Sequence, residues 1–214
     1  MNETLNQCDL LITGGQVIDG TGCPAITADV ALQGDRIIAV GDLTVGKAEA
    51  VIDARGKVIT PGFIDVHTHD DRLLLVNPEV TPKLSQGVTT VVVGNCGVSL
   101  SPWLSDRAPP PPLDLVFPDG KNGAHFSTFH SYSTELARRP AAINALPLIG
   151  HSTLRCGVMD RLDRPATQAE IEQMRALLRE SLAAGAGGFS TGLFYPPNKA
   201  APASEVEALA RELP

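Results

Sequence analysis

Short runs of β-forming residues, separated by Gly and Asp, fill the first sixty residues of the chain. Dipeptides such as Gly14-Gly15 and Gly34-Asp35 are typical of turns, so this pattern predicts a meander of antiparallel strands. The expected strands are Asp9–Thr13, Gln16–Ile18, Asp29–Leu32, Arg36–Val40, Ala50–Asp53 and Lys57–Ile59. Roughly fifty residues form little more than half of a β-sandwich, and such a sheet needs a second layer to cover one face. We therefore expect residues 1–58 to be the N-terminal part of a small β-sandwich domain.

The pattern changes near residue 60 to apolar strand, loop and helix in repetition. The expected strands are short apolar runs of the kind that parallel sheets bury on both faces, and they cover Phe63–Val66, Thr89–Val93, Ala145–Ile149 and Gly188–Thr191. The clearest helix covers Thr167–Ala184, where Thr167 and Glu170 form a capping box and Gly185 suits the end. A weaker helix covers Phe129–Arg139, and the Pro-rich stretch Asp106–Gly123 predicts an extended loop.

Alternation of strand and helix predicts an α/β fold, either an open doubly wound sheet or a barrel. A complete (β/α)8 barrel takes roughly 250 residues, whereas only four β/α units follow residue 60. A last capping box, Ser204 with Glu207, predicts a final helix close to Pro214. We expect residues 59–214 to form the first half of a TIM barrel, and the sequence to be the front part of a longer protein.

The composition of the chain excludes some classes of binding partner. The net charge of −7 argues against nucleic acid or an anionic membrane surface, and no apolar run is long enough to cross a bilayer. The N-terminus lacks the basic start and apolar run of a secretory signal, and four irregularly spaced cysteines form no disulfide framework. We expect a cytoplasmic protein, and the sequence leaves its oligomeric state open.

Two histidines directly follow the first apolar strand of the second region. Side chains two residues apart on a strand project the same way, so His67 and His69 are expected side by side at its C-terminal end. Active sites of α/β barrels lie at this end of the sheet. Hydrogen bonds to water are the alternative for two polar residues at a strand end, but the position favours a pair of metal ligands.

Cys96 holds the corresponding position after the next strand, within Gly94-Asn95-Cys96-Gly97. The glycines allow the backbone to bend closely around the side chain, and a thiolate is a strong zinc ligand, so Cys96 is a third candidate ligand. Free cysteine is more often a small buried hydrophobic residue. We expect that role for Cys8, Cys23 and Cys156.

His151 and Tyr195 follow later strands of the predicted sheet, so each could reach the C-terminal end of the sheet where His67 and His69 are expected. Each also has a purely structural interpretation. His151, with Arg155 four residues later, either lines the mouth or only hydrogen-bonds a loop. Tyr195, which is followed by two prolines, either contacts a ligand or only fills space in the packing of the protein. His125 and His130 are expected at the surface.

These residues alone predict at least one divalent metal at a barrel mouth and favour metal-assisted hydrolysis, because a metal lowers the pKa of bound water and polarises a carbonyl. Two histidines and one cysteine do not fill two metal sites, and no general base is evident.

Several segments resemble one enzyme family. Ile59–Asp71 resembles the first barrel strand of the amidohydrolase superfamily, and Asp9–Gly22 resembles its small β-domain. Thr81–Ser99, Gly150–Arg155 and Gly187–Asn198 are similar to the N-acyl-D-amino-acid deacylases, or D-aminoacylases, and the Asn-Cys-Gly element is specific to that subgroup. The similarity covers nearly the whole chain.

The resemblance implies zinc held by Cys96, which reaches both metal positions, with His67 and His69 as ligands of the second, weaker position. Tyr195 matches a tyrosine that lines the substrate pocket. The fourth strand, Gly188–Thr191, lacks the lysine that hydantoinases use to bridge their metals, which favours the deacylase branch. The implied reaction is hydrolysis of an N-acyl-D-amino acid to a carboxylate and a free D-amino acid.

Family members run to roughly twice this length, and two zinc histidines and the proton-shuttling aspartate match positions beyond residue 214. We therefore expect this chain alone to be inactive. The alternatives are another amidohydrolase, such as a dihydroorotase-like or hydantoinase-like cyclic amidase, and a non-catalytic half-barrel that needs a partner chain.

Overall fold

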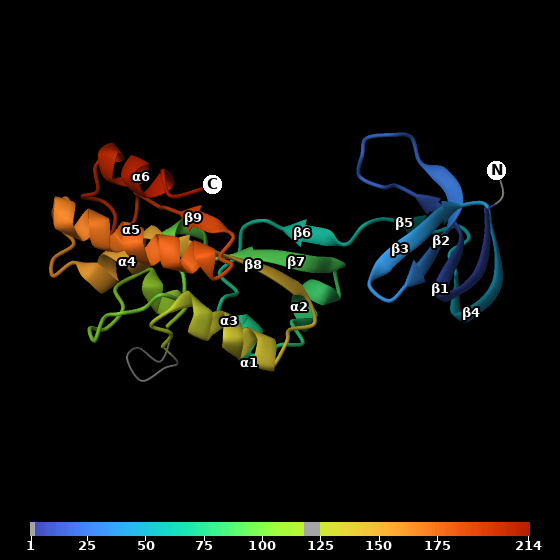
Figure 1. Ribbon diagram of the computed structural model, residues 1–214, viewed down its shortest axis with the longest axis horizontal. Helices are drawn as coiled ribbons and strands as arrows, with labels where there is room; N and C mark the ends of the chain where they lie inside the picture. The colour runs from blue at the N-terminus through green and yellow to red at the C-terminus, as the bar shows by residue number, and fades with distance from the viewer. Residues whose placement is uncertain (1–2, 118–124) are drawn as a thin grey trace. The chain divides into compact units, whose positions relative to one another are not determined.

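The computed structural model describes residues 3–117 and 125–214 (Figure 1). Contacts divide the chain into two compact units between Gly62 and Phe63, close to the domain boundary expected after residue 58. Each unit is described by itself below.

The N-terminal unit is a five-stranded sheet built around one long strand. Its strands are β1 (Glu3–Val17), β2 (Ile26–Gln33), β3 (Arg36–Gly41), β4 (Leu43–Asp53) and β5 (Val58–Ile59). The order is β3-β2-β1-β4, and β5 also pairs with β1. The first three strands are antiparallel, as expected, but β4 and β5 pair with β1 in parallel. The prediction of a simple meander is therefore wrong for these two strands.

The error has a local cause at Gly14-Gly15. The sequence predicts a turn there, but the chain continues as one strand with a bulge, and Gly14 has a left-handed φ of +68°. The Asp29 carboxylate accepts a hydrogen bond from Gly14 N at 2.8 Å, which holds the bulge. A single strand of fifteen residues offers one edge to β2 and the other to both β4 and β5.

The sheet of this unit has a small core, and several of its larger apolar side chains are exposed. Its buried centre consists of small residues, Cys8, Ala31 and Ala39. Larger apolar side chains stay exposed, among them Ile37, Val51 and Val58. That a second layer covers this sheet remains a prediction from its size.

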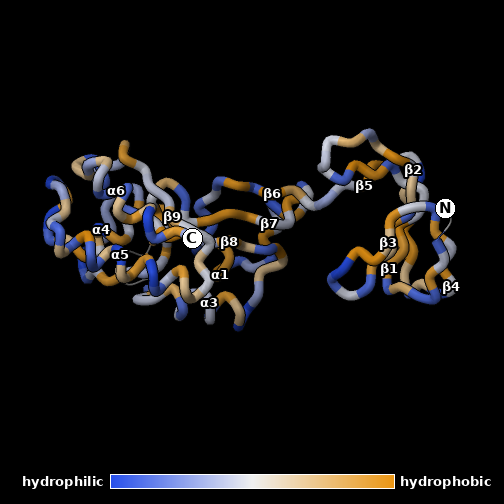
Figure 2. Tube along the Cα trace, turned by 45° about the horizontal axis from the view of Figure 1, so that its top comes forward, coloured by the Kyte–Doolittle hydropathy of each residue, from blue (hydrophilic) through white to orange (hydrophobic). Residues whose placement is uncertain are grey.

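The second unit contains a parallel sheet in strict chain order. Strands β6 (Phe63–Asp65), β7 (Val88–Val93), β8 (Asn144–Gly150) and β9 (Gly188–Ser190) run β6-β7-β8-β9, and every neighbouring pair is parallel. Hydrophobic residues run along β7, where Val91 and Val93 are fully buried (Figure 2). This is the sheet expected of the first four β/α units of a barrel.

Helices follow each of these strands along the chain. They are α1 (Leu73–Val76), α2 (Thr81–Leu84), α3 (Phe129–Arg138), α4 (His151–Val158), α5 (Gln168–Ala183) and α6 (Ala203–Ala210), with 3-10 turns η1 (Asn95–Gly97) and η2 (Leu113–Leu115). Within residues 3–117 and 125–214, no helix combines the length and apolar character needed to cross a membrane.

The helix predictions hold in part. The expected helices near Phe129 and Thr167 are present, while α1, α2 and α4 are not anticipated. The final helix is present, but the prediction of a capping box at Ser204 is wrong, because α6 starts at Ala203 with Pro202 as its cap, two residues before Ser204. The expected loop over Asp106–Gly123 contains the short turn η2, and its residues 118–123 lie outside the described residues.

The capping box of α5 gives a direct stability test. Thr167 Oγ1 accepts a hydrogen bond from Glu170 N, and the Glu170 carboxylate accepts one from Thr167 N at 2.7 Å. Thr167→Ala removes the first bond, so we expect a loss of about 1 kcal/mol in the free energy of unfolding. Urea denaturation measures this free energy. The control is Thr60→Ala, at an exposed position in the N-terminal unit, which should change the free energy of unfolding little.

Candidate metal site

The two histidines lie where the sequence places them, just beyond the end of β6. Thr68, between them, donates its backbone N–H to Val92 O at 3.1 Å, so this segment continues the pairing with β7. The Asp65 carboxylate accepts a hydrogen bond from His67 N at 3.2 Å and forms an ion pair with Lys83 Nζ at 2.5 Å. Backbone and side-chain contacts thus fix the start of the His67–His69 segment.

Cys96 lies in a tight turn that follows β7, the Cys96 turn (Gly94–Gly97). Gly94, Cys96 and Gly97 all have left-handed backbone angles, with φ of +76°, +56° and +79°. A left-handed conformation is unusual for a residue with a Cβ. It directs the Cys96 side chain back towards the His67–His69 segment.

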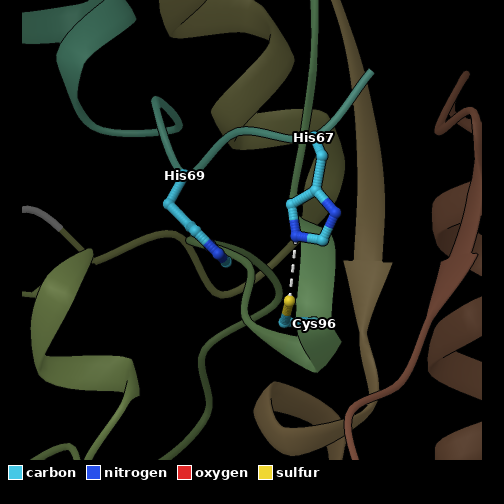
Figure 3. Close-up of side chains that lie close together, drawn as sticks. All are labelled: His67, His69 and Cys96. Carbon is cyan, nitrogen blue, oxygen red and sulfur yellow. Dashed lines mark hydrogen bonds between the residues drawn. The ribbon is translucent and has the colours of Figure 1, made fainter. Parts of the chain in front are cut away.

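The three predicted ligands converge (Figure 3). His67 Nε2 lies 3.0 Å from Cys96 Sγ, and one ligand atom from each of the three residues lies within 4.8 Å of the others. The ring centroids of His67 and His69 are 5.9 Å apart. Two imidazoles and a sulfur from neighbouring strand ends therefore face one small space.

The chemistry of this set fits zinc. Imidazole nitrogen and thiolate are its usual ligands, and three protein ligands leave the fourth position that catalytic sites keep open. His69 Nδ1 is buried and has no hydrogen-bond partner, as expected of a nitrogen that faces a metal position. Burial, followed by the charge of His67, lowers the pKa of His69 and favours the neutral form that binds metals.

Tyr195 lies beside the Cys96 sulfur. Electrostatic interaction with Cys96, followed by a hydrogen bond between the two side chains, raises the pKa of the Tyr195 hydroxyl. Gly192 makes this approach possible, because a Cβ there would lie 2.5 Å from Cys96 O and 2.7 Å from the Tyr195 ring. The tyrosine therefore reaches the candidate metal site from the loop after β9.

His151 and Arg155 belong to a different, fully buried arrangement. His151 Nδ1 contacts Thr191 Oγ1 at 2.9 Å, and its Nε2 contacts Glu205 Oε1 at 2.9 Å. Arg155 donates to the same Glu205 oxygen and to Pro197 O at 2.7 Å. We call His151, Arg155 and Glu205 the buried network. The sequence leaves open whether His151 lines the site or only makes hydrogen bonds. In the structure both of its ring nitrogens make hydrogen-bond contacts, and it is not one of the three clustered ligands.

Glu205 is the anion of the buried network and was not singled out from the sequence. Burial alone would raise its pKa, but hydrogen bonds from His151, Arg155 and the Ala166 N–H outweigh burial and lower the pKa to about 2. Burial is the main reason that the pKa of His151 is lowered. A neutral His151 and an ionised Glu205 are therefore the expected forms at neutral pH.

The remaining predictions about His and Cys residues have mixed outcomes. His125 and His130 are exposed, as expected. Cys8 and Cys156 are buried, but Cys23 is exposed, so the expectation of a buried hydrophobic role is wrong for it. Cys23 lies in the connection between β1 and β2, outside the core of the sheet.

Comparison with known proteins places these observations in a family. Residues 50–214 match the model of the amidohydrolase family, and the chain belongs to that family. It is 54% identical over 206 residues to an N-acyl-D-aspartate deacylase of Alcaligenes xylosoxydans xylosoxydans, an alignment that covers 96% of this chain and 41% of the relative. A D-aminoacylase of the same organism is 50% identical, with 96% and 42% covered.

Solved structures agree. A D-aminoacylase with a binuclear metal centre superposes with a TM-score of 0.91 at 51% identity, covering 96% of this chain and 43% of that one. An N-acyl-D-glutamate deacylase from Bordetella bronchiseptica, complexed with zinc and a phosphonate mimic of the tetrahedral intermediate, gives 0.87 at 42% identity, covering 97% and 43%. The predicted family and the partial TIM-barrel fold are confirmed, and the chain spans about two fifths of the length of these relatives.

Proposed function

We propose that this chain carries a zinc site for the hydrolysis of N-acyl-D-amino acids, with His67, His69 and Cys96 as the ligands. The observation that carries the proposal is the convergence of the three side chains, with 3.0 Å between His67 Nε2 and Cys96 Sγ and an unpartnered nitrogen on His69. Zinc at this position would act as a Lewis acid that polarises the amide carbonyl of the substrate.

Tyr195 is the residue that we assign to substrate binding. Its hydroxyl lies against Cys96, so a substrate amide held at the metal would lie next to it. A phenol that hydrogen-bonds the amide would orient the scissile carbonyl towards the metal.

We further infer that the reaction takes place in the cytoplasm. All four cysteines are free, and a cysteine that serves as a metal ligand must stay reduced. The substrate is then a small cytoplasmic amide, and nothing in the charge of the chain favours nucleic acid.

The proposal is tested by ligand binding to the zinc-loaded chain. The probe is a phosphonate analogue of N-acetyl-D-aspartate in which phosphorus replaces the scissile carbonyl carbon, with its L-enantiomer as control. Calorimetry should show that binding requires zinc, prefers the D-form and weakens several-fold in Tyr195→Phe. Equal binding of the two enantiomers, or binding that does not need zinc, would contradict the proposal. Since no carboxylate joins the ligand cluster among the described residues, binding rather than turnover is the readout.

A further inference from the structure

The Cys96 turn needs support from outside itself. Cys96 has a Cβ and a left-handed backbone, a combination that persists only where neighbouring groups hold it. Its backbone also lies against other backbone: a Cβ on Gly94 would meet Leu148 O, and a Cβ on Gly150 would meet Gly97 O. Polar groups that hold this turn therefore decide where the sulfur points.

One side chain bridges both ends of the turn. Ser190, the last residue of β9, accepts a hydrogen bond from Gly97 N at 3.0 Å and donates one to Gly94 O. A hydroxyl is both donor and acceptor, so one serine can satisfy both groups. Ser190 comes from a strand that is not a neighbour of β7, because β8 lies between them in the sheet.

Two further hydrogen bonds act on the first residues of the same turn. The buried Asp71 carboxylate accepts a hydrogen bond from Gly94 N at 3.1 Å. Asn95 Nδ2 donates to Val92 O at 2.9 Å. These contacts fix the start of the turn, whereas Ser190 is the side chain that ties its start to its end, on either side of Cys96.

We infer that Ser190 is a positioning residue for the metal site, which holds the Cys96 turn in the left-handed conformation that aims Sγ at His67 and His69. The inference rests on the proposed function, because it assigns Ser190 an effect on a metal bound by Cys96. Residues that orient a metal ligand typically change metal affinity by about 10- to 100-fold when removed.

The test uses the whole chain and an isosteric pair of variants. Ser190→Thr keeps the hydroxyl, and Ser190→Val replaces it by a methyl group of the same shape, so the two differ only in the hydrogen bonds. Zinc affinity is measured by competition with a chelating indicator, and bound Co²⁺ reports the sulfur ligand through its near-ultraviolet charge-transfer band. Ser181→Ala is the control, because Ser181 is equally a serine that bonds a backbone carbonyl, here Leu177 O within α5.

We expect Ser190→Thr to bind zinc like the wild type and Ser190→Val to bind about 10- to 100-fold more weakly, with a shifted or weaker cobalt–sulfur band. Ser181→Ala should keep wild-type affinity. Equal affinity and equal spectra for the Thr and Val variants would overturn the role of Ser190 and leave the metal site standing. A wild-type chain without a cobalt–sulfur band would instead contradict the proposed metal site itself.

Discussion

Cys96→Ala is expected to lower the affinity of the chain for Zn²⁺ by more than about 100-fold, the upper end of what loss of a ligand-orienting residue costs. Cys96 supplies the sulfur of the cluster, and its Sγ lies 3.0 Å from His67 Nε2. A thiolate carries a negative charge into the site, so its removal leaves two neutral imidazoles that bind zinc without charge compensation.

The measurement is zinc competition at neutral pH with an indicator of known affinity. Cys23→Ala is the matched control, because Cys23 is also a free cysteine but lies exposed in the N-terminal unit. Zinc affinity of the wild type should fall as the pH is lowered, since protons compete for the thiolate and imidazoles. If Cys96→Ala and Cys23→Ala bound zinc equally, Cys96 would not be a ligand.

The candidate site could be predicted because it depends on the directions of strands. Residues that follow neighbouring parallel strands meet at one edge of the sheet, so the positions of His67, His69 and Cys96 are sufficient to bring them together. Tyr195 also follows a strand of this sheet, and it lies beside the cysteine. For these residues, the alternation of strand and helix is enough to predict that their side chains meet at one edge of the sheet.

The supporting residues could not be predicted, because they depend on which backbone groups lack partners. Ser190 ends its strand like any small polar residue, and only the left-handed turn at Cys96 gives it two bonds to make. The sequence does not predict helix α4 for a related reason: besides Leu154 and Cys156 it buries the polar residues His151, Thr153 and Arg155. These three side chains hydrogen-bond long-range partners, such as Glu205 and the Ser99 backbone, that a periodicity analysis does not detect.

Glu205→Gln is expected to reduce the free energy of unfolding by about 3–5 kcal/mol. Glu205 is the anion of the buried network, and both it and Arg155 are fully shielded from solvent. The substitution leaves the Arg155 guanidinium buried without a counter-charge, which costs far more than a lost surface ion pair.

Urea denaturation followed by the fluorescence of Trp103 measures this change. Trp103 is the one tryptophan of the chain and is buried in the second unit, so its signal reports the unit that contains the network. The control is Glu207→Gln on the same helix, where the side chain is exposed and a change within about 0.5 kcal/mol is expected. Equal stability of the two variants would show that the network contributes nothing.

Acid should remove the difference between the wild type and Glu205→Gln. The pKa of Glu205 lies at about 2 in the folded chain, below its ordinary value of 4.5, so the unfolded state binds the proton more readily. The stabilisation is therefore complete above pH 4.5 and is lost as the pH falls towards 2.

A double variant, Arg155→Met with Glu205→Leu, removes both charges and should unfold less readily than Glu205→Gln, because no charge is left buried alone. If the double variant were as unstable as the single one, packing rather than charge would account for the loss.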